Sequence, residues 1–339
     1  MNNQNRSSAS LLEVRGLTTS FASPDGPIRV VEDVSLYVNE GETLGLVGES
    51  GCGKSVTALS IMGLVPSPPG QIEHGEVLFE GHDLLQYSET EMQSIRGRRI
   101  AMIFQEPMTS LNPVLTVGWQ LVEPLRLHLN MPKRAAYMRA YELLEMVGIP
   151  DPGTRLEDYP HRMSGGQRQR VMIAMALSCN PSLIIGDEAT TALDVTIQAQ
   201  VLELMADLTA EFNTALLIIT HNMGIVARYA DRVNVMYSGK IREAGTADDI
   251  YGNPKHPYTI GLLNSIPSFE RSTDERLQAI PGEIPDPANR PSGCAFRPRC
   301  PWGVEGCAEE EPPLTTVQGD HLSACWEQAR VSMSGSVTP

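Results

Sequence analysis

The sequence predicts an α/β fold with a largely parallel sheet core and an attached antiparallel β subdomain. Two continuous apolar runs, at 182–188 and 215–221, are each flanked by helical patterns, which is typical of parallel strands buried on both faces. Apolar and polar residues alternate between 11 and 38, and this period predicts antiparallel strands with one solvated face. A helix-rich insert and a loop-rich, cysteine-containing C-terminal extension complete the predicted architecture.

The composition excludes several classes of protein. A length of 339 residues suggests roughly two domains. The 41 acidic and 26 basic residues give a net charge of −15, which argues against a nucleic-acid partner. The chain has no run of 18 uncharged apolar residues and no apolar region near its N-terminus, so neither a membrane span nor a secretory signal is expected. Six cysteines without an export signal do not indicate a disulfide scaffold, and a cytosolic protein is expected.

The local patterns predict the elements in order. A strand, a glycine-rich turn and a helix are expected over 43–64, two short strands over 71–84, and a polar helix followed by a strand over 85–104. After Ser164, helices at 168–179 and 197–212 alternate with the two buried strands. The predicted divisions are a disordered N-terminus (1–10), a core domain (11–255) with a helical subdomain at about 106–175, a C-terminal extension (256–330) and a tail (331–339).

The glycine-rich turn matches the phosphate-binding consensus G-x-x-x-x-G-K-[ST] (Walker A) without a mismatch. Its glycines let successive backbone N–H groups point at one oxyanion, and the helix that starts near Lys54 adds its positive end. Lys54 is expected to reach the β- and γ-phosphates and the Ser55 hydroxyl to bind Mg²⁺. Cys52 is interpreted as a tolerated small side chain, with a redox sensor as the alternative. The predicted nucleotide-binding residues are Gly48, Glu49, Ser50, Gly51, Cys52, Gly53, Lys54 and Ser55.

The strand at 182–188 ends in two carboxylates, Asp187 and Glu188. Because neighbouring side chains on a strand point in opposite directions, the pair is expected to divide two tasks. Asp187 would reach the Mg²⁺ shell, and Glu188 would face a water molecule in line with the γ-phosphate. Together with the phosphate-binding loop, this pair predicts hydrolysis as well as binding.

The segment MSGGQRQRV, about twenty residues before DEATTALD, resembles the signature motif of ATP-binding cassette (ABC) transporter ATPases. Other motifs of that family occur in order over residues 11–255. Gln105 resembles the Q-loop glutamine, Asp194 the D-loop aspartate and His221 the switch histidine. Phe21 resembles the aromatic residue that stacks on adenine, with strand packing as the alternative.

This resemblance implies a role for each matching residue. Gln105 and Asp187 would complete the Mg²⁺ environment, Glu188 would be the general base, and His221 would contact the γ-phosphate. Ser164 and Gly166 would close on ATP bound to the partner's loop in an ATPase dimer. Family departures at three positions remove no catalytic group: Met163, Ala189 and Asn222. The signature and D-loop residues assigned to nucleotide binding are Ser164, Gly165, Gly166, Gln167 and Asp194.

The HPYT segment at 256–259 and the C-terminal extension resemble the ATPases of di- and oligopeptide importers, a group that includes nickel importers. The resemblance implies two transmembrane permease subunits, an extracytoplasmic solute-binding protein and a second, related ATPase at the cytoplasmic face of the membrane. An apolar surface around Met108, Leu111 and Val114 would receive a permease helix. Nickel chelates and opine-like solutes remain alternative cargoes. The peptide-importer tail disfavours an exporter ATPase, and the single cassette with its short insert disfavours a soluble ABC ATPase of DNA repair or translation.

Four cysteines of the extension have the spacing C-x₅-C-x₆-C-x₁₇-C. Four thiolates in a short, proline-rich segment can hold Zn²⁺ or a [4Fe–4S] cluster. The absence of C-x₂-C pairs argues against an ordinary zinc ribbon, and the resemblance to cluster-binding family members favours [4Fe–4S]. Four reduced, packed cysteines without a metal are the remaining alternative. The residues concerned are Cys294, Cys300, Cys307 and Cys325.

Overall fold

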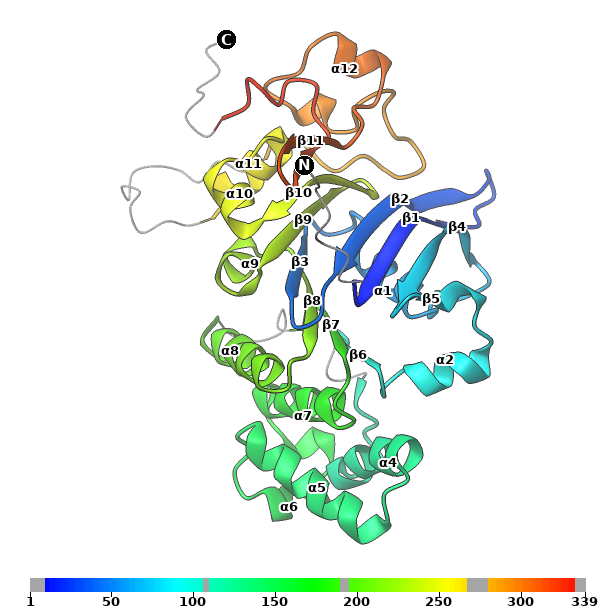
Figure 1. Cartoon of the computed structure of the whole chain (residues 1–339), viewed down its shortest axis with the longest axis vertical. Coiled ribbons are helices and arrows are strands. Elements are labelled where there is room, and N and C mark those ends of the chain that lie inside the picture. The colour runs from blue at the N-terminus through cyan, green and yellow to red at the C-terminus, as the bar shows by residue number, and fades with distance from the viewer. Residues whose placement is uncertain (1–9, 106–109, 190–194, 267–279, 333–339) are drawn as a thin grey trace, which may run out of the picture. The chain divides into compact units, whose positions relative to one another are not determined.

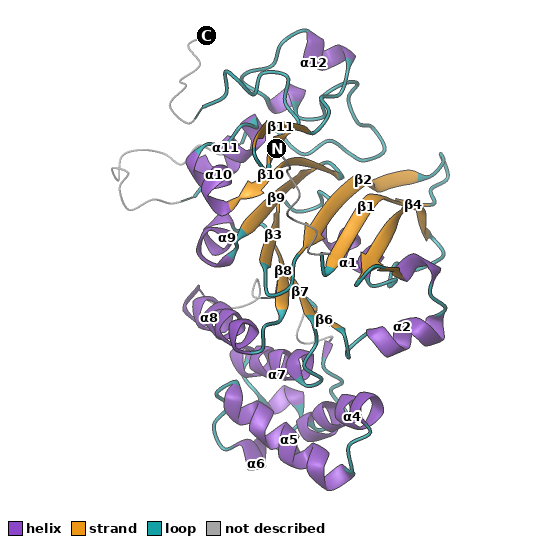
Figure 2. Cartoon of the chain, viewed as in Figure 1, coloured by secondary structure: helices purple, strands orange, loops and turns teal. Residues whose placement is uncertain are grey.

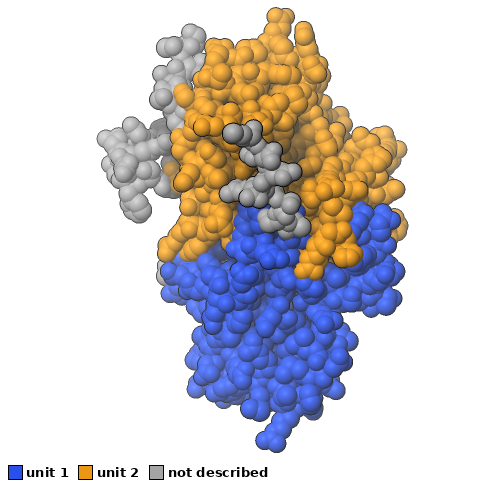
Figure 3. Space-filling view, in the orientation of Figure 1, with its two compact units in different colours: residues 1–11, 38–42, 83–219 blue, residues 12–37, 43–82, 220–339 orange. Residues whose placement is uncertain are grey.

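The computed structural model describes residues 10–105, 110–189, 195–266 and 280–332. Its contacts divide the chain into two compact units (Figure 3). Unit 1 comprises residues 1–11, 38–42 and 83–219, and unit 2 comprises residues 12–37, 43–82 and 220–339. The two units are divided at other residues than the predicted domains, so the domain boundaries at 255/256 and 330/331 stay predictions.

Unit 1 contains a parallel sheet in which β7 pairs with both β6 and β8 (Figures 1 and 2). Every residue of β7 and β8 is buried, as expected for parallel strands covered on both faces. The elements are α2 (Glu89–Ile95), β6 (Ile100–Ile103), α4 (Val117–Leu129), α5 (Lys133–Met146), α6 (Pro152–Glu157), η2 (Pro160–Arg162), α7 (Gly165–Leu177), β7 (Leu183–Asp187), α8 (Val195–Glu211) and β8 (Ala215–Thr220).

Helices α4 to α7 of unit 1 pack on one another and confirm the helix-rich insert. Local capping defines where they begin. The Thr116 hydroxyl accepts a hydrogen bond from the Trp119 N–H (3.2 Å) at the start of α4, and Pro152 occupies the first position of α6.

Unit 2 contains two groups of strands. One sheet has the order β2-β1-β4-β5, with β1 and β4 antiparallel. The other group has the order β11-β12-β10-β9-β3, in which β3 runs parallel to β9 and the remaining pairs are antiparallel. The elements are β1 (Leu12–Phe21), β2 (Ile28–Val38), β3 (Thr43–Val47), α1 (Lys54–Ile61), β4 (Gly70–Phe79), β5 (His82–Asp83), α9 (Met223–Tyr229), β9 (Arg232–Tyr237), β10 (Lys240–Thr246), α10 (Ala247–Gly252), α11 (Pro257–Asn264), η3 (Arg297–Arg299), α12 (Gly306–Glu309), β11 (Thr315–Gln318) and β12 (His321–Ser323); the short helix η1 (Leu84–Gln86) that follows β5 belongs to unit 1.

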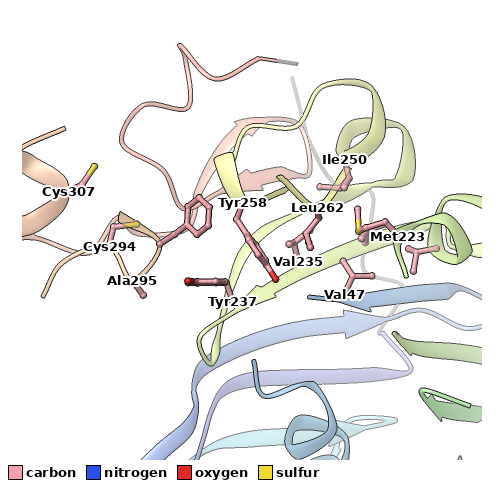
Figure 4. Packing of buried hydrophobic residues seen from close by; sticks show 13 residues of the cluster. Val47, Met223, Val235, Tyr237, Ile250, Tyr258, Leu262, Cys294, Ala295 and Cys307 are labelled. Carbon is pink, nitrogen blue, oxygen red and sulfur yellow. The ribbon is translucent and has the colours of Figure 1, made fainter. Parts of the chain in front are cut away.

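The C-terminal extension shares the core of unit 2. Val47 and Val235 lie in the same buried cluster as Tyr258, Phe296 and residues around them (Figure 4). Burial of an aromatic or aliphatic side chain of this size stabilises a fold by about 1.5–3 kcal/mol. Strand β12 also pairs with β10. The many prolines and few periodic runs of the extension predict a separate, loop-rich appendage. This prediction is wrong, because apolar residues of the extension are buried with β9 and with β3, the strand that leads into the phosphate-binding loop.

The observed elements confirm the predicted α/β class with parallel core strands and an antiparallel subdomain. None of the helices in the described ranges is both long and apolar enough to cross a membrane.

Candidate nucleotide-binding site

The phosphate-binding loop joins β3 to α1 in unit 2, as predicted. Gly48 has φ +156°, and a Cβ built there would lie 2.2 Å from the Met236 carbonyl oxygen. Gly53 is the N-cap of α1 with φ +111°, and no side chain caps this helix. The first N–H groups of a helix have no partner inside the helix. With no side-chain cap, the start of α1 is suited to bind an anion.

Lys54 lies inside the loop that it follows in sequence. Its side chain is buried, and Nζ donates to the carbonyl oxygens of Gly48 (2.8 Å) and Glu49 (3.0 Å). Ser55, the second residue of α1, is half-buried. The loop thus concentrates an ammonium, a hydroxyl and a helix N-terminus, which are the groups that bind nucleotide phosphates.

Cys52 is packed inside the loop. Its exposed fraction is 1%, and burial raises the pKa of its thiol against the opposing effect of Lys54. A redox-sensing thiol needs a lowered pKa and access to solvent. Both properties favour the interpretation of Cys52 as a small packed side chain.

The two predicted carboxylates lie in unit 1, at the end of β7. Asp187 is the last residue of that strand and is buried. Glu188 follows the strand with φ +46°, and its N–H donates to the Ile219 carbonyl (2.9 Å). The strand-alternation argument for dividing the two carboxylates is therefore wrong, because Glu188 is in a left-handed conformation and not in the strand.

Gln105 and Glu188 lie next to each other in the structure. Gln105 Nε2 donates to Glu188 Oε2 over 2.9 Å. A non-glycine residue with positive φ is uncommon and costs conformational energy. The Ile219 carbonyl and the Gln105 amide both hold Glu188 in this conformation, so its carboxylate has a defined direction.

The signature segment forms the start of α7. The Ser164 hydroxyl accepts from the Gln167 N–H (3.3 Å), while Gln167 Oε1 accepts from the Ser164 N–H (3.0 Å). This reciprocal pair is a capping box. A Cβ on Gly166 would lie 2.9 Å from Ile197 Cγ2, so the glycine permits close approach of α8. Gly165 and Gly166 occupy the first turn, where N–H groups are available to an anion.

The remaining predicted residues lie at element ends. His221 is exposed between β8 and α9. Asn222 caps α9, since its Oδ1 accepts from the Gly224 N–H (2.9 Å). The asparagine, which differs from the usual family residue at this position, therefore stabilises the start of the helix. Phe21 is half-buried at the end of β1. Asp194 and Met108 lie outside the described residues.

Comparison with known proteins identifies the family. A family model described as "ABC transporter" matches residues 31–191, and another, "Oligopeptide/dipeptide transporter, C-terminal region", matches residues 242–307. Oligopeptide transport ATP-binding protein OppD of Bacillus subtilis is 54% identical over 93% of this chain and 88% of its own. The chain belongs to the ABC transporter ATP-binding proteins.

Further relatives of this ABC protein agree. Oligopeptide transport ATP-binding protein AppD of Bacillus subtilis is 53% identical over 94% of this chain and 97% of its own. Among solved structures, the dimeric post-hydrolysis state of the ATP-binding cassette MJ0796 bound to ADP and Pi has a TM-score of 0.63 at 26% identity, covering 70% of this chain and 98% of that one.

The four cysteines of the ABC protein's extension line one pocket with about 310 Å³ of empty space, part of it open to solvent. All four are free thiols. Burial raises the pKa of Cys300 and Cys325 to about 12 and also raises that of Cys294. No group of three or more His, Cys, Asp or Glu side chains in the described ranges is arranged to hold a metal ion. The structure thus gathers the predicted cysteines without supplying direct support for the predicted metal.

The expected permease-docking surface needs one correction. Leu111 is 1% exposed, whereas Val114 is 75% exposed. Leu111 therefore belongs to the core of the helical region. Because Leu111 is buried, Leu111→Asp would disturb packing, and this variant does not test docking cleanly.

Two residues near the loop were missed by sequence reasoning. The Glu49 N–H donates to Tyr258 Oη (2.7 Å), and the Glu49 carboxylate receives two hydrogen bonds from Arg299 (2.8 and 2.9 Å). These partners are 209 and 250 positions away in the chain. No local spacing predicts such contacts.

Proposed function

We propose that this chain is the ATP-binding and ATP-hydrolysing subunit that energises an ABC importer of di- and oligopeptides. The named relatives are oligopeptide transport ATP-binding proteins, and the C-terminal region matches the corresponding transporter family. Nickel chelates and opine-like solutes are the alternative cargoes, since an ATPase subunit does not itself bind the transported solute.

The observation that carries the ATPase proposal is the phosphate-binding loop on an uncapped helix. Gly53 leaves the first turn of α1 without a side-chain cap, and Lys54 is held beside the loop carbonyls. In the proposed mechanism, the loop N–H groups and Lys54 bind the β- and γ-phosphates of ATP. These groups are in place before chemistry begins, so little reorganisation is needed.

Each predicted site residue has a role in the proposed reaction. Glu188 accepts a proton from the attacking water, and Gln105 orients the Glu188 carboxylate through the observed hydrogen bond. His221 contacts the γ-phosphate. Ser55, Gln105 and Asp187 would hold Mg²⁺, which neutralises charge on the phosphates when bound.

The proposed working unit is larger than one chain. Two ATPase chains would close on ATP. The residues of one chain that would contact ATP bound to the phosphate-binding loop of the other are Ser164, Gly165, Gly166, Gln167 and Asp194. The second ATPase would be a related chain, and both would lie at the cytoplasmic face of two permease subunits served by a solute-binding protein. The exposed Val114 side chain is a candidate contact for a permease helix.

Substitution of Glu188 tests the reaction. Glu188→Gln keeps the size of the side chain and removes the base, so turnover should fall by about 10²–10⁴-fold. Affinity for a fluorescent ATP analogue should be retained. Glu145→Gln, on the exposed surface of α5, is the matched control and should hydrolyse ATP at the wild-type rate. Hydrolysis by Glu188→Gln at the wild-type rate would show that another group is the base.

We further propose that Cys294, Cys300, Cys307 and Cys325 hold a [4Fe–4S] cluster. Four thiols on one pocket fit its donor chemistry. The absence of C-x₂-C pairs among these cysteines argues against an ordinary zinc ribbon. Zn²⁺ or no metal are the alternatives.

Metal analysis of anaerobically purified protein distinguishes these alternatives. The proposal predicts about four irons and matching sulfide per chain, with loss of iron in Cys300→Ser and Cys325→Ser. One zinc and no iron would make the site a structural metal site. Absence of both metals would show that the cysteines are packed thiols.

A further inference from the structure

Glu49 occupies a position where the phosphate-binding consensus accepts any residue, yet each of its polar groups has a partner. Its N–H donates to Tyr258 Oη (2.7 Å), and its carbonyl accepts from Lys54 Nζ (3.0 Å). Its carboxylate accepts from both terminal nitrogens of Arg299. Two of the three partners belong to the part of the chain that follows residue 255. The phosphate-binding loop is therefore held in part by residues that lie outside the consensus motif.

Arg299 is a rigid anchor for this contact. Its side chain is 4% exposed, against 30% for Glu49. Arg299 Nε donates to the Pro281 carbonyl (2.8 Å), and the guanidinium lies near the rings of Tyr237 and Phe296. Burial disfavours the charge, but the hydrogen bonds to Glu49 and Tyr237 raise the pKa of Arg299 above its ordinary value. A planar guanidinium fixed on several sides sets the direction of the carboxylate that it binds.

Tyr258 fixes the backbone of the same residue. It is fully buried at the second position of α11, and its ring lies 4.6 Å from that of Tyr237 (Figure 4). The Glu49 N–H is used by this phenol oxygen. Phosphate must therefore be bound by N–H groups later in the loop, and the path of the backbone into those groups is set at Glu49.

The contact with Arg299 also changes the electrostatics of the phosphate-binding loop. A carboxylate in a phosphate-binding loop repels the negative charges of a nucleotide. The bidentate pair with Arg299 neutralises Glu49 locally. Loss of Arg299 would leave this repulsion unopposed, whereas loss of both charges would remove it.

We propose that Tyr258 and Arg299 are positioning residues for ATP, which hold Glu49 and, through its carbonyl, place Lys54 for the phosphates. This inference rests on the proposed ATPase function. It assigns to the C-terminal extension control over nucleotide affinity, and it leaves the chemical step to other residues. Because Cys300 directly follows Arg299 and lines the cysteine pocket, the same anchor connects that pocket to the phosphate-binding loop.

A double-mutant cycle on the full-length chain tests the charge pair. Arg299→Gln should raise KM for ATP about tenfold, with kcat changed less than about twofold, as expected for coupled neighbouring residues. Glu49→Gln should have a smaller effect. The double variant Glu49→Gln/Arg299→Gln should bind ATP more tightly than Arg299→Gln alone, because the unpaired carboxylate is gone.

Controls separate positioning from folding. Arg330→Gln removes an exposed arginine of the extension that pairs with Glu327 (2.7 Å), and KM should not change. Tyr258→Phe deletes one oxygen and should raise KM a few-fold while the melting temperature stays within a few degrees. A purely structural role would lower kcat through loss of active protein and leave KM unchanged, which would overturn the proposal.

Two further outcomes distinguish failure of the positioning role from failure of the proposed function. An unchanged KM in both Arg299→Gln and Tyr258→Phe, with a wild-type chain that hydrolyses ATP, would refute the positioning role alone. Failure of the wild-type chain to bind ATP would refute the proposed function itself.

Discussion

Two helices that are expected to meet nucleotide begin in opposite ways. Helix α7 in unit 1 starts with Ser164 and Gln167, which cap each other within one turn. Helix α1 in unit 2 starts with Gly53 and has no side-chain cap. The first N-terminus is completed by its own sequence. The second keeps its N–H groups for a ligand and depends on Tyr258 and Arg299 to hold the preceding loop.

The comparison shows how a phosphate-binding loop can be stabilised while the N–H groups of its helix stay available to phosphate. A side-chain cap would compete with phosphate for the N–H groups of α1. Contacts at Glu49 restrain the loop four residues before the N-cap and leave the N-terminus open. The signature segment at the start of α7 depends less on contacts from distant residues, because Ser164 and Gln167 of its capping box are only three positions apart.

Gly53→Ala should have the largest effect on ATP affinity, because it changes the N-cap of α1. A Cβ at φ +111° would lie 2.9 Å from the Val30 carbonyl oxygen and 2.8 Å from Met236 Cε. Strain of about 1–3 kcal/mol per site would be relieved by moving the loop, and ATP affinity should fall by roughly 10–100-fold. The measurement is titration with a fluorescent ATP analogue.

Gly81→Ala is the matched control for Gly53→Ala. Gly81 also has positive φ (+80°), but a Cβ there meets nothing within 4 Å. This variant should lose stability and keep its ATP affinity. Equal loss of affinity in both variants would mean that general destabilisation, and not the shape of the loop, explains the result.

Helix α11, which carries Tyr258, has a titratable residue, His256, as its N-cap. His256 Nδ1 accepts from the Tyr258 N–H (3.1 Å), and burial, aided by Arg242, lowers the pKa of His256 to about 3. The unfolded chain takes up this proton near pH 6.5. Acidification from pH 7 to 5 therefore favours the unfolded state, and the free energy of unfolding should fall by about 2 kcal/mol through this residue.

His256→Asn keeps an N-cap acceptor and removes the titration. Urea unfolding at pH 7, 6 and 5 should show a shallower pH dependence in the variant than in the wild type. Parallel curves for the two proteins would show that His256 takes up no extra proton on unfolding. That result would contradict its buried, neutral state.

Ser164→Ala should have the smallest effect on the stability of the separate chain, because it removes a local cap. The expected cost is about 1 kcal/mol, seen as roughly fivefold faster hydrogen exchange of amides in the first turns of α7. Ser164→Asn supplies another capping oxygen and should restore slow exchange. Unchanged exchange in Ser164→Ala would mean that packing alone holds this N-terminus.

Much of the fold was predictable because its signals are local. The apolar runs of β7 and β8 predict buried parallel strands, and the loop consensus between β3 and α1 needs only consecutive residues. The prediction for Glu188 was less accurate. Strand alternation assumes extended backbone, whereas the Ile219 carbonyl and the Gln105 amide hold this residue at φ +46°.

The fold class, the phosphate-binding loop and the family could be predicted from the amino-acid sequence, since they depend on residue types at short and regular spacings. Two features became visible only in the folded chain: the C-terminal extension shares a core with β9, and Arg299 and Tyr258 hold Glu49. The physical reason is that hydrogen bonds and burial act over a few ångströms in space. Residues 209 and 250 positions apart meet only after the chain has folded.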